Sequence, residues 1–141
     1  SFPTRRSSDL TAQEFEKVLK EGLRGEHYIP IMFISVLKKQ RLYRMLELAT
    51  AVYHERQKRI KTSELNRFLE RIVAASHPAD YGKYQVKLNY CTQVKSAPPV
   101  FVFYTNFPEA IKENYRKYIE NKIREQYGFW GVPITLVFKK K

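Results

Sequence analysis

The stretch YQVKLNYCTQVKSAPPVFVFYT, residues 84–105, carries the strongest strand signals of this 141-residue chain. From Tyr84 to Tyr90 apolar side chains alternate with polar ones, and this period predicts a strand with one buried face. Residues 96–99 read Ser-Ala-Pro-Pro and predict a turn. Residues 100–105 are more apolar and predict a second strand.

A helix is predicted on each side of these strands. Thr62 is the expected N-cap of the first, which should end at His77-Pro78 because proline disfavours helical backbone in the residue before it. The inward face of this helix is Leu65, Phe68, Leu69, Ile72 and Val73. Pro108 suits the first turn of the second helix, and Gly128 suits its end. Its apolar stripe is Ile111, Tyr115, Tyr118, Ile119, Ile123 and Tyr127.

A third strand is predicted over residues 134–138, followed by Lys139, Lys140 and Lys141. The order from residue 56 to 141 is therefore α-β-β-α-β, with three strands and two amphipathic helices. This order predicts an α+β domain with a three-stranded sheet covered by helices. It is the order found in KH-like domains.

Residues 1–55 show a different pattern, helix-strand-helix. Thr11 and Glu14 form an expected capping box, and apolar residues at helical spacing follow until Gly25. Residues 29–36 are nearly all apolar, as in a strand buried on both faces of a parallel sheet. A second helix should carry Leu42, Met45, Leu46, Ala49, Val52 and Tyr53 on one face. Two helices cannot cover such a strand alone, so this part is interpreted as the end of a larger α/β domain.

The junction between the two parts is expected in the polar, basic stretch 54–61. At the other end of the first part, residues 1–8 are interpreted as foreign or misread sequence. They have no apolar run behind their arginines, so a signal peptide is not expected.

Net charge points to a polyanion partner. The chain has a formal charge of +12; residues 1–56 hold 10 basic and 7 acidic residues, and residues 57–141 hold 16 and 7, so the excess lies in the second part. A merely solubilising surface is the alternative. The candidates for phosphate contacts are Lys83, Lys87, Lys95, Arg116, Lys117, Lys139, Lys140 and Lys141. Four neighbouring aromatics, Tyr84, Tyr90, Tyr115 and Tyr118, are expected in the core rather than as stacking platforms for bases.

Catalytic and metal signals are weak. No Gly-x-x-x-x-Gly-Lys-Ser/Thr phosphate loop occurs in the sequence, so this chain by itself is not expected to be an enzyme. The three histidines lie far apart and suggest no zinc site. The single cysteine, Cys91, is expected to pack in a strand and fits a reducing cytoplasm. No apolar run approaches the ~20 residues of a membrane span, so no membrane partner is expected.

Several motifs in fixed order resemble the C-terminal part of the Der (EngA) family of ribosome-assembly GTPases. They lie within residues 56–141 and include Asn66-Arg67-Phe68-Leu69, His77-Pro78, Tyr90-Cys91-Thr92-Gln93-Val94, Pro98-Pro99-Val100-Phe101, Tyr115-Arg116-Lys117-Tyr118-Ile119-Glu120-Asn121, Arg124 and Phe129-x-Gly131-x-Pro133-Ile134. The resemblance implies a KH-like domain over residues 56–141. It also implies that residues 1–55 are the C-terminal remnant of a P-loop GTPase domain.

The same resemblance places a nucleotide-binding motif at Ser35, Val36 and Leu37. In the family a Ser-Ala-Lys or Ser-Ala-Leu tripeptide backs the guanine base, largely through backbone amides; here Val36 replaces the alanine. Asp9 lies near the expected guanine-reading Asn-Lys-x-Asp motif, but the Asn and Lys are missing and no role is assigned to it.

For function, the resemblance implies a cytoplasmic parent protein that binds GTP with Mg²⁺ and acts in large-subunit ribosome assembly. The KH-like domain would contact ribosomal RNA and dock on the GTPase domains, and this fragment alone would bind no cofactor. The alternative is a purely intramolecular regulatory domain, which the lack of a Gly-x-x-Gly clamp favours. A standalone RNA-binding module is a third hypothesis, against which the orphaned helix-strand-helix part argues.

Overall fold

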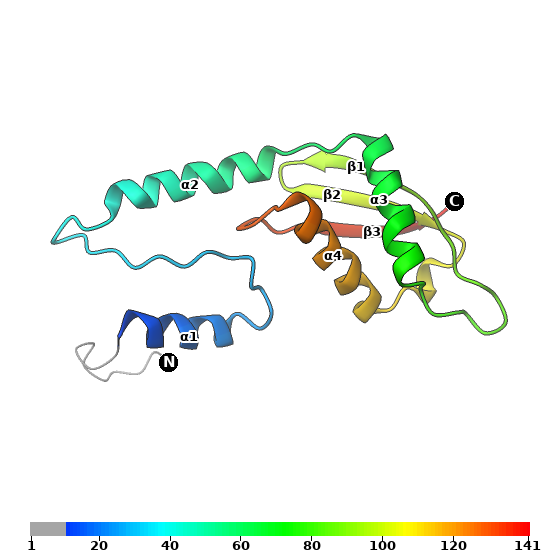
Figure 1. Ribbon diagram of the computed structural model, residues 1–141, viewed down its shortest axis with the longest axis horizontal. Helices are drawn as coiled ribbons and strands as arrows, with labels where there is room; N and C mark the ends of the chain where they lie inside the picture. Colours follow the sequence, from blue (N-terminus) through cyan, green and yellow to red (C-terminus); the bar gives the residue numbers. More distant parts are fainter. Residues whose placement is uncertain (1–10) are drawn as a thin grey trace.

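The computed structural model describes residues 11–141, so the expectations for residues 1–8 and Asp9 lie outside the described residues. Figure 1 shows a sheet with helices α3 and α4 over one face, joined through α2 to a more open N-terminal part. The elements are α1 (Ala12–Gly22), α2 (Leu42–Gln57), α3 (Thr62–Ala75), β1 (Leu88–Ser96), β2 (Pro99–Thr105), the short 3₁₀ helix η1 (Pro108–Ala110), α4 (Glu113–Tyr127) and β3 (Thr135–Lys140).

The three strands form one sheet in the order β1-β2-β3. Strands β1 and β2 are antiparallel, as the short connection between them allows, whereas β2 and β3 are parallel. A parallel pair needs a crossover, and α4 supplies it. The predicted α+β class and the α-β-β-α-β order are confirmed.

The first strand begins four residues later than predicted, at Leu88 instead of Tyr84, and runs on to Ser96. Two features hold the preceding residues out of the sheet. Tyr81 and Tyr84 close a tight turn on each other, and the Lys87 amide donates to the Asn106 side chain instead of to a strand. At the other end Ser96 pairs with Pro99, so β2 starts one residue before the predicted position.

Two helix starts also differ from the prediction. Thr62 is the first residue of α3 and not its N-cap, which is Lys61; the Thr62 hydroxyl lies 3.3 Å from that of Thr92. Pro108 begins only a single 3₁₀ turn, and α4 starts at Glu113. Ile111 is buried between them, outside either helix.

Helices α3 and α4 pack on the inner face of the sheet. The core comprises Ile60, Leu65, Phe68, Leu69, Ile72, Cys91, Phe101, Phe103, Ile119, Ile123 and Phe129. Tyr118 and Tyr115 of α4 donate hydroxyl hydrogen bonds of 2.8 Å to the carbonyls of Ile72 and Ser76, respectively, at the C-terminal end of α3. Burial raises the pKa of the Cys91 thiol to about 12, consistent with the predicted packing role.

The N-terminal part contains α1, an extended segment and α2. The capping box is confirmed, because the Glu14 amide donates to the Thr11 hydroxyl and the Glu14 carboxylate accepts from the Thr11 amide. The predicted strand over 29–36 is wrong: the segment forms only an isolated bridge between Ser35 and Gln40. A strand needs a neighbour to bond its backbone, and no other strand of the described residues lies beside it.

Helix α2 buries none of its residues, and its apolar face is largely open, with Leu46 58% and Tyr53 56% exposed. It extends to Gln57, so the connector is shorter than the predicted 54–61. Within residues 11–141, no helix has the length and apolar character needed to cross a membrane.

The loop between α4 and β3 holds the N-terminal part against the sheet domain. The Glu55 carboxylate of α2 accepts a 2.7 Å hydrogen bond from the Phe129 amide, and the Gly131 amide donates to the Tyr28 carbonyl at 2.6 Å. The Arg124 guanidinium lies 3.6 Å from the centre of the Tyr28 ring and donates to the Phe129 carbonyl. The two parts are therefore joined by specific contacts as well as by the chain.

Gly131 is required at this junction for two separate reasons. Its φ is +72°, and a Cβ there would lie 2.7 Å from Val52 Cγ2. Gly82 has a similar φ of +61°, but a Cβ at Gly82 would have no atom within 4 Å. Substitution of Gly82 therefore measures the backbone strain alone. We expect Gly82→Ala to lower the free energy of unfolding by about 1 kcal/mol. Gly131→Ala should lower it by roughly 3 kcal/mol, because overpacking adds to the strain.

Urea unfolding followed by circular dichroism measures both variants. Adding Val52→Ala to Gly131→Ala should recover part of the loss, since it removes the nearest atoms. Equal destabilisation by the two glycine substitutions would show that α2 does not press on this loop in solution.

Candidate nucleic-acid interface

Five of the eight predicted phosphate-contact residues lie at one end of the sheet. Lys139 and Lys140 end β3, where they pair with Tyr104 and Thr105 at the end of β2. The Lys141 amide donates to the Thr105 carbonyl, which keeps the C-terminal lysine beside that strand. In Figure 1 the C-terminus and the loop that precedes β1 lie at the same end of the sheet.

Lys87 is held at this end by Asn106. The Asn106 Oδ1 accepts a 2.8 Å hydrogen bond from the Lys87 amide, and its Nδ2 donates to the Gln85 carbonyl at 2.9 Å. Because Asn106 directly follows β2, the segment 85–87 is tied to the end of the second strand. Lys83, four residues earlier, belongs to the turn that continues this segment. We call Lys83, Lys87, Lys139, Lys140 and Lys141 the basic end.

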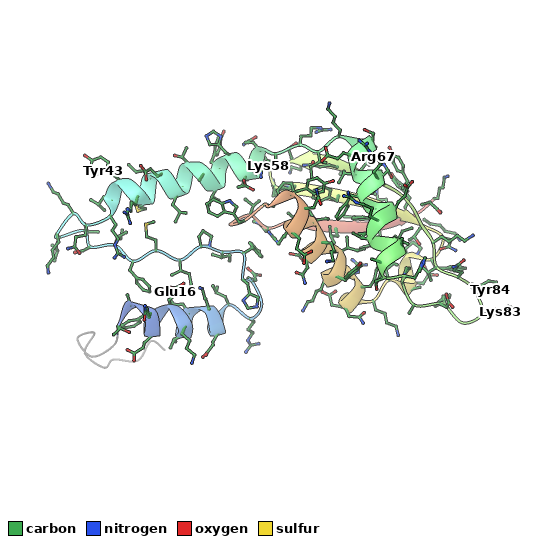
Figure 2. The ribbon with its side chains drawn as sticks, viewed as in Figure 1. Glu16, Tyr43, Lys58, Arg67, Lys83 and Tyr84 are labelled. Atoms are coloured by element: carbon green, nitrogen blue, oxygen red, sulfur yellow. The ribbon has the colours of Figure 1, made fainter. Side chains whose placement is uncertain are left out.

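All five side chains of the basic end are exposed. Figure 2 shows Lys83 and Tyr84 together at the outer tip of the loop that precedes β1. Exposed ammonium groups at separate points of one surface are suited to contact successive phosphates of a backbone without reading bases. Such contacts supply affinity that falls as salt rises.

The other three candidates lie elsewhere or have another role. Lys95 is at the opposite end of β1, where it pairs with Val100. Lys117 is exposed on α4 and lines a cavity of about 590 Å³ shared with Arg24 and Arg124.

Arg116 packs into the domain. Its guanidinium lies 4.6 Å from the centre of the Phe138 ring, and its Nε donates to the Ile111 carbonyl. Phe138 in turn stacks on the core residue Phe103 at 5.2 Å between ring centres. Arg116 is thus only partly available to a ligand, and replacing it would disturb packing.

The expectation that all four neighbouring tyrosines belong to the core is wrong for two of them. Tyr84 is 53% and Tyr90 41% exposed. Tyr84 lies outside the strand, in the turn that interrupts the predicted alternation. Tyr90 is adjacent to the inward-facing Cys91, and its ring lies 6.0 Å from that of Tyr104 on the next strand. Tyr115 and Tyr118 are partly buried against the core as predicted.

The predicted nucleotide motif lies in a small loop between Ser35 and Gln40. The Gln40 amide donates to the Ser35 carbonyl at 3.0 Å, and the Ser35 hydroxyl accepts from the Lys38 amide at 3.3 Å. Val36 and Leu37 at its tip are 71% and 97% exposed. An exposed loop of this kind fits a role in which backbone amides face a planar base, so the motif stays a prediction.

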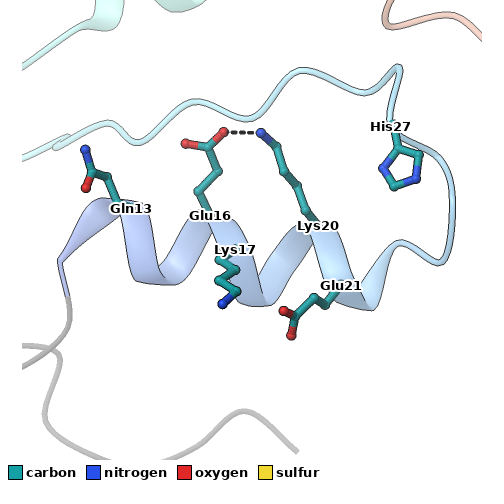
Figure 3. Close-up of a pocket in the computed structure, with 6 residues that line it drawn as sticks. All are labelled: Gln13, Glu16, Lys17, Lys20, Glu21 and His27. Carbon is teal, nitrogen blue, oxygen red and sulfur yellow. Dashed lines mark ion pairs between the residues drawn. The ribbon is translucent and has the colours of Figure 1, made fainter.

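No catalytic arrangement emerges elsewhere in the described residues. A hollow of about 510 Å³ beside α1 contains Glu16 and Glu21, but Glu16 forms an ion pair with Lys20 at 2.5 Å (Figure 3). His27 lines the same hollow without a nucleophile beside it. Among residues 11–141 no group of three His, Cys, Asp or Glu side chains is placed to hold a metal ion.

Sequence reasoning missed Asn106 and Phe107 as parts of this region. Their position between a strand and Pro108 reads only as a strand exit. No local signal reveals their role, because the alternation of residues 84–90 predicts a strand whose backbone is already paired in the sheet.

Comparison with known proteins gives consistent matches. Residues 59–139 match the family described as "KH-domain-like of EngA bacterial GTPase enzymes, C-terminal". The chain is 42% identical over 131 residues to GTPase Der of Chlorobium chlorochromatii (strain CaD3), covering 93% of this chain and 30% of the relative. It is 42% identical over 132 residues to GTPase Der of Chloroflexus aggregans (strain MD-66 / DSM 9485), covering 93% and 29%.

A third relative, GTPase Der of Chloroherpeton thalassium (strain ATCC 35110 / GB-78), is 38% identical over 133 residues, covering 94% of this chain and 31% of the relative. The chain thus spans about a third of the length of the relatives that it matches. With the family match over most of the sheet domain, this similarity shows that the chain belongs to the Der (EngA) GTPase family and contains its C-terminal KH-like domain.

Proposed function

We propose that this chain is the C-terminal part of a cytoplasmic GTP-binding factor in the assembly of the large ribosomal subunit. Its KH-like domain, residues 56–141, contacts ribosomal RNA through phosphates bound by the basic end. The observation that carries this proposal is the collection of Lys83, Lys87 and the three C-terminal lysines at one end of one sheet. The net charge of +12 supports it.

The GTPase relatives support nucleotide binding by a longer parent protein. GTP and Mg²⁺ belong to that parent, in which the loop at Ser35, Val36 and Leu37 would lie against the guanine base. The open apolar face of α2, and the absence of a partner strand beside residues 29–34 within the described part of the chain, fit a GTPase domain that is larger than this N-terminal part.

A second function, docking that responds to the nucleotide state, is favoured by one specific observation. The Glu55–Phe129 contact and the Gly131–Tyr28 contact join the N-terminal part to the KH-like domain. A change in the GTPase domain would reach the KH-like domain through α2. The two functions are compatible, and the regulatory one alone predicts no RNA affinity for the isolated chain.

Charge reversal at the basic end tests the RNA proposal. We expect Lys83→Glu with Lys87→Glu to weaken binding to purified bacterial large ribosomal subunits about tenfold or more at moderate salt. The slope of log K against log[salt] should become shallower by about 2, since each lost phosphate contact removes roughly 0.9 from it. Filter binding or biolayer interferometry across a salt series measures both quantities.

The matched control is Lys95→Glu with Lys117→Glu, which changes the net charge equally but lies away from the basic end. It should weaken binding less and leave most of the slope. Equal losses in both pairs, or binding that ignores salt, would show that the basic end is not the contact surface.

The chain itself should not hydrolyse GTP, because its sequence contains no phosphate loop. Phosphate release by the purified 141-residue chain should equal that of buffer, with a full-length GTPase Der from one of the relatives as the positive control. Activity that co-elutes with the chain through a second purification step would refute this expectation.

A further inference from the structure

An exposed aromatic cluster adjoins the lysines of the basic end. The ring of Phe107 lies 5.3 Å from that of Tyr81 and 5.6 Å from that of Tyr84, with interplanar angles of 35° and 31°. Tyr81 is 46% and Tyr84 53% exposed, so both rings present a large part of their surface to solvent. Aromatic side chains usually gain stability from burial, so an exposed pair calls for a ligand or a packing explanation.

The turn that carries the two tyrosines is held by backbone hydrogen bonds. Tyr81 and Tyr84 exchange two backbone hydrogen bonds of 2.9 and 3.0 Å, and Gly82 supplies the positive φ of +61° that the turn needs. The two hydrogen bonds of Asn106 then fix the following residues to the end of β2. A platform that is already ordered loses little conformational entropy when a ligand binds.

The electrostatic setting favours an anionic, planar ligand. Lys83 Nζ lies over the Tyr84 ring, 5.4 Å from its centre, so a cationic group stands directly beside this face of the ring. From residue 77 to 107 the sequence has three lysines and a single acid, Asp80. A nucleotide offers both parts, a π face for the ring and a phosphate for the ammonium group.

We propose that the turn Tyr81–Tyr84 is a stacking site for one unpaired base of RNA, with Lys83 and Lys87 on the flanking phosphates. This inference rests on the proposed RNA contact and adds to it, because phosphate contacts alone do not distinguish paired from unpaired nucleotides. Stacking on an aromatic ring tolerates any base, so the site selects unpaired structure rather than sequence. An apolar protein segment is the competing occupant, and the lysines around the rings argue against it.

The test uses the 141-residue chain and two RNA hairpins of equal length and charge. One hairpin carries a single bulged adenosine, and the other carries an abasic nucleotide at the same position. Because the phosphates are identical, any difference in affinity reports on the base. We expect the chain to bind the bulged hairpin about tenfold more tightly, within the range measured for single base–aromatic stacks.

Tyr84→Ala should abolish this preference and leave affinity for the abasic hairpin unchanged. Tyr84→Phe keeps the ring and should retain the preference. Tyr90→Ala removes a similarly exposed tyrosine of the sheet and should also retain it. Protection of the buried Cys91 from alkylation shows in each variant that the domain is folded.

The outcomes separate the two proposals. The unmodified chain could bind both hairpins with equal affinity and in a salt-sensitive way. That result would overturn the stacking site and leave the phosphate contact standing. A preference that survives Tyr84→Ala in a folded variant would overturn it as well. Failure of the unmodified chain to bind either hairpin or large subunits would overturn the proposed RNA function itself.

Discussion

The buried amide of Gln93 is the interaction on which the arrangement of the rest depends. This side chain is only 3% exposed, and its Oε1 accepts a 2.8 Å hydrogen bond from the Ile60 amide. Its Nε2 donates to the carbonyls of Lys58 and Lys95. Leaving a buried amide group without a partner costs about twice what its hydrogen bond contributes, so these bonds favour the observed position of the connector beside β1. That position determines where α3 begins and where α2 ends.

A second side-chain amide, that of Asn66, fixes α3 to the edge strand β1. It accepts from the Cys91 amide at 2.9 Å and donates to the Cys91 carbonyl at 3.0 Å, so the outer strand has partners on both sides at this point. A covered edge cannot pair with another chain there. The contacts of Glu55 with Phe129 and of Lys58 with the Tyr127 carbonyl extend this polar framework to the end of α4. Apolar packing gives the domain its stability, and these few polar groups decide which elements meet.

The sequence was sufficient for the features that depend on local period. The helix and strand order of residues 56–141, the α+β class, the capping box at Thr11 and the packing of Cys91 all follow from the spacing of nearby residues. The start of β1 was not predictable in this way, because it depends on Asn106, nineteen residues away from Lys87 in the chain. The segment 29–36 has the composition of a strand, but composition cannot provide the neighbouring strand that it needs.

The candidate interface shows the same division. Charge alone identified the lysines, yet their collection at one end requires the parallel register of β2 and β3. The helical pattern predicted Arg116 on the surface, but its guanidinium packs over the Phe138 ring of β3. Tyr84 followed the alternation of a strand and was expected inside, whereas a turn centred on Gly82 and Lys83 carries it outward. Contacts between residues far apart in the chain explain the first two differences, and the local turn explains the third.

The hydrogen bond between the Phe129 amide and the Glu55 carboxylate attaches the last turns of α2 to the loop between α4 and β3, and this attachment has a mechanical consequence. A 16-residue helix is about 24 Å long, since each residue rises 1.5 Å. Held at Val52 and Glu55, it is a stiff arm whose pivot is one end, with its free end at Leu42, directly after the loop of Ser35 and Gln40. A displacement of a few ångströms at the free end corresponds to a tilt of only about ten degrees at the pivot, by the same helix geometry. A movement of a few ångströms near that loop would therefore rotate the sheet domain only slightly. Conversely, a small rotation of the sheet domain would displace the loop by several ångströms.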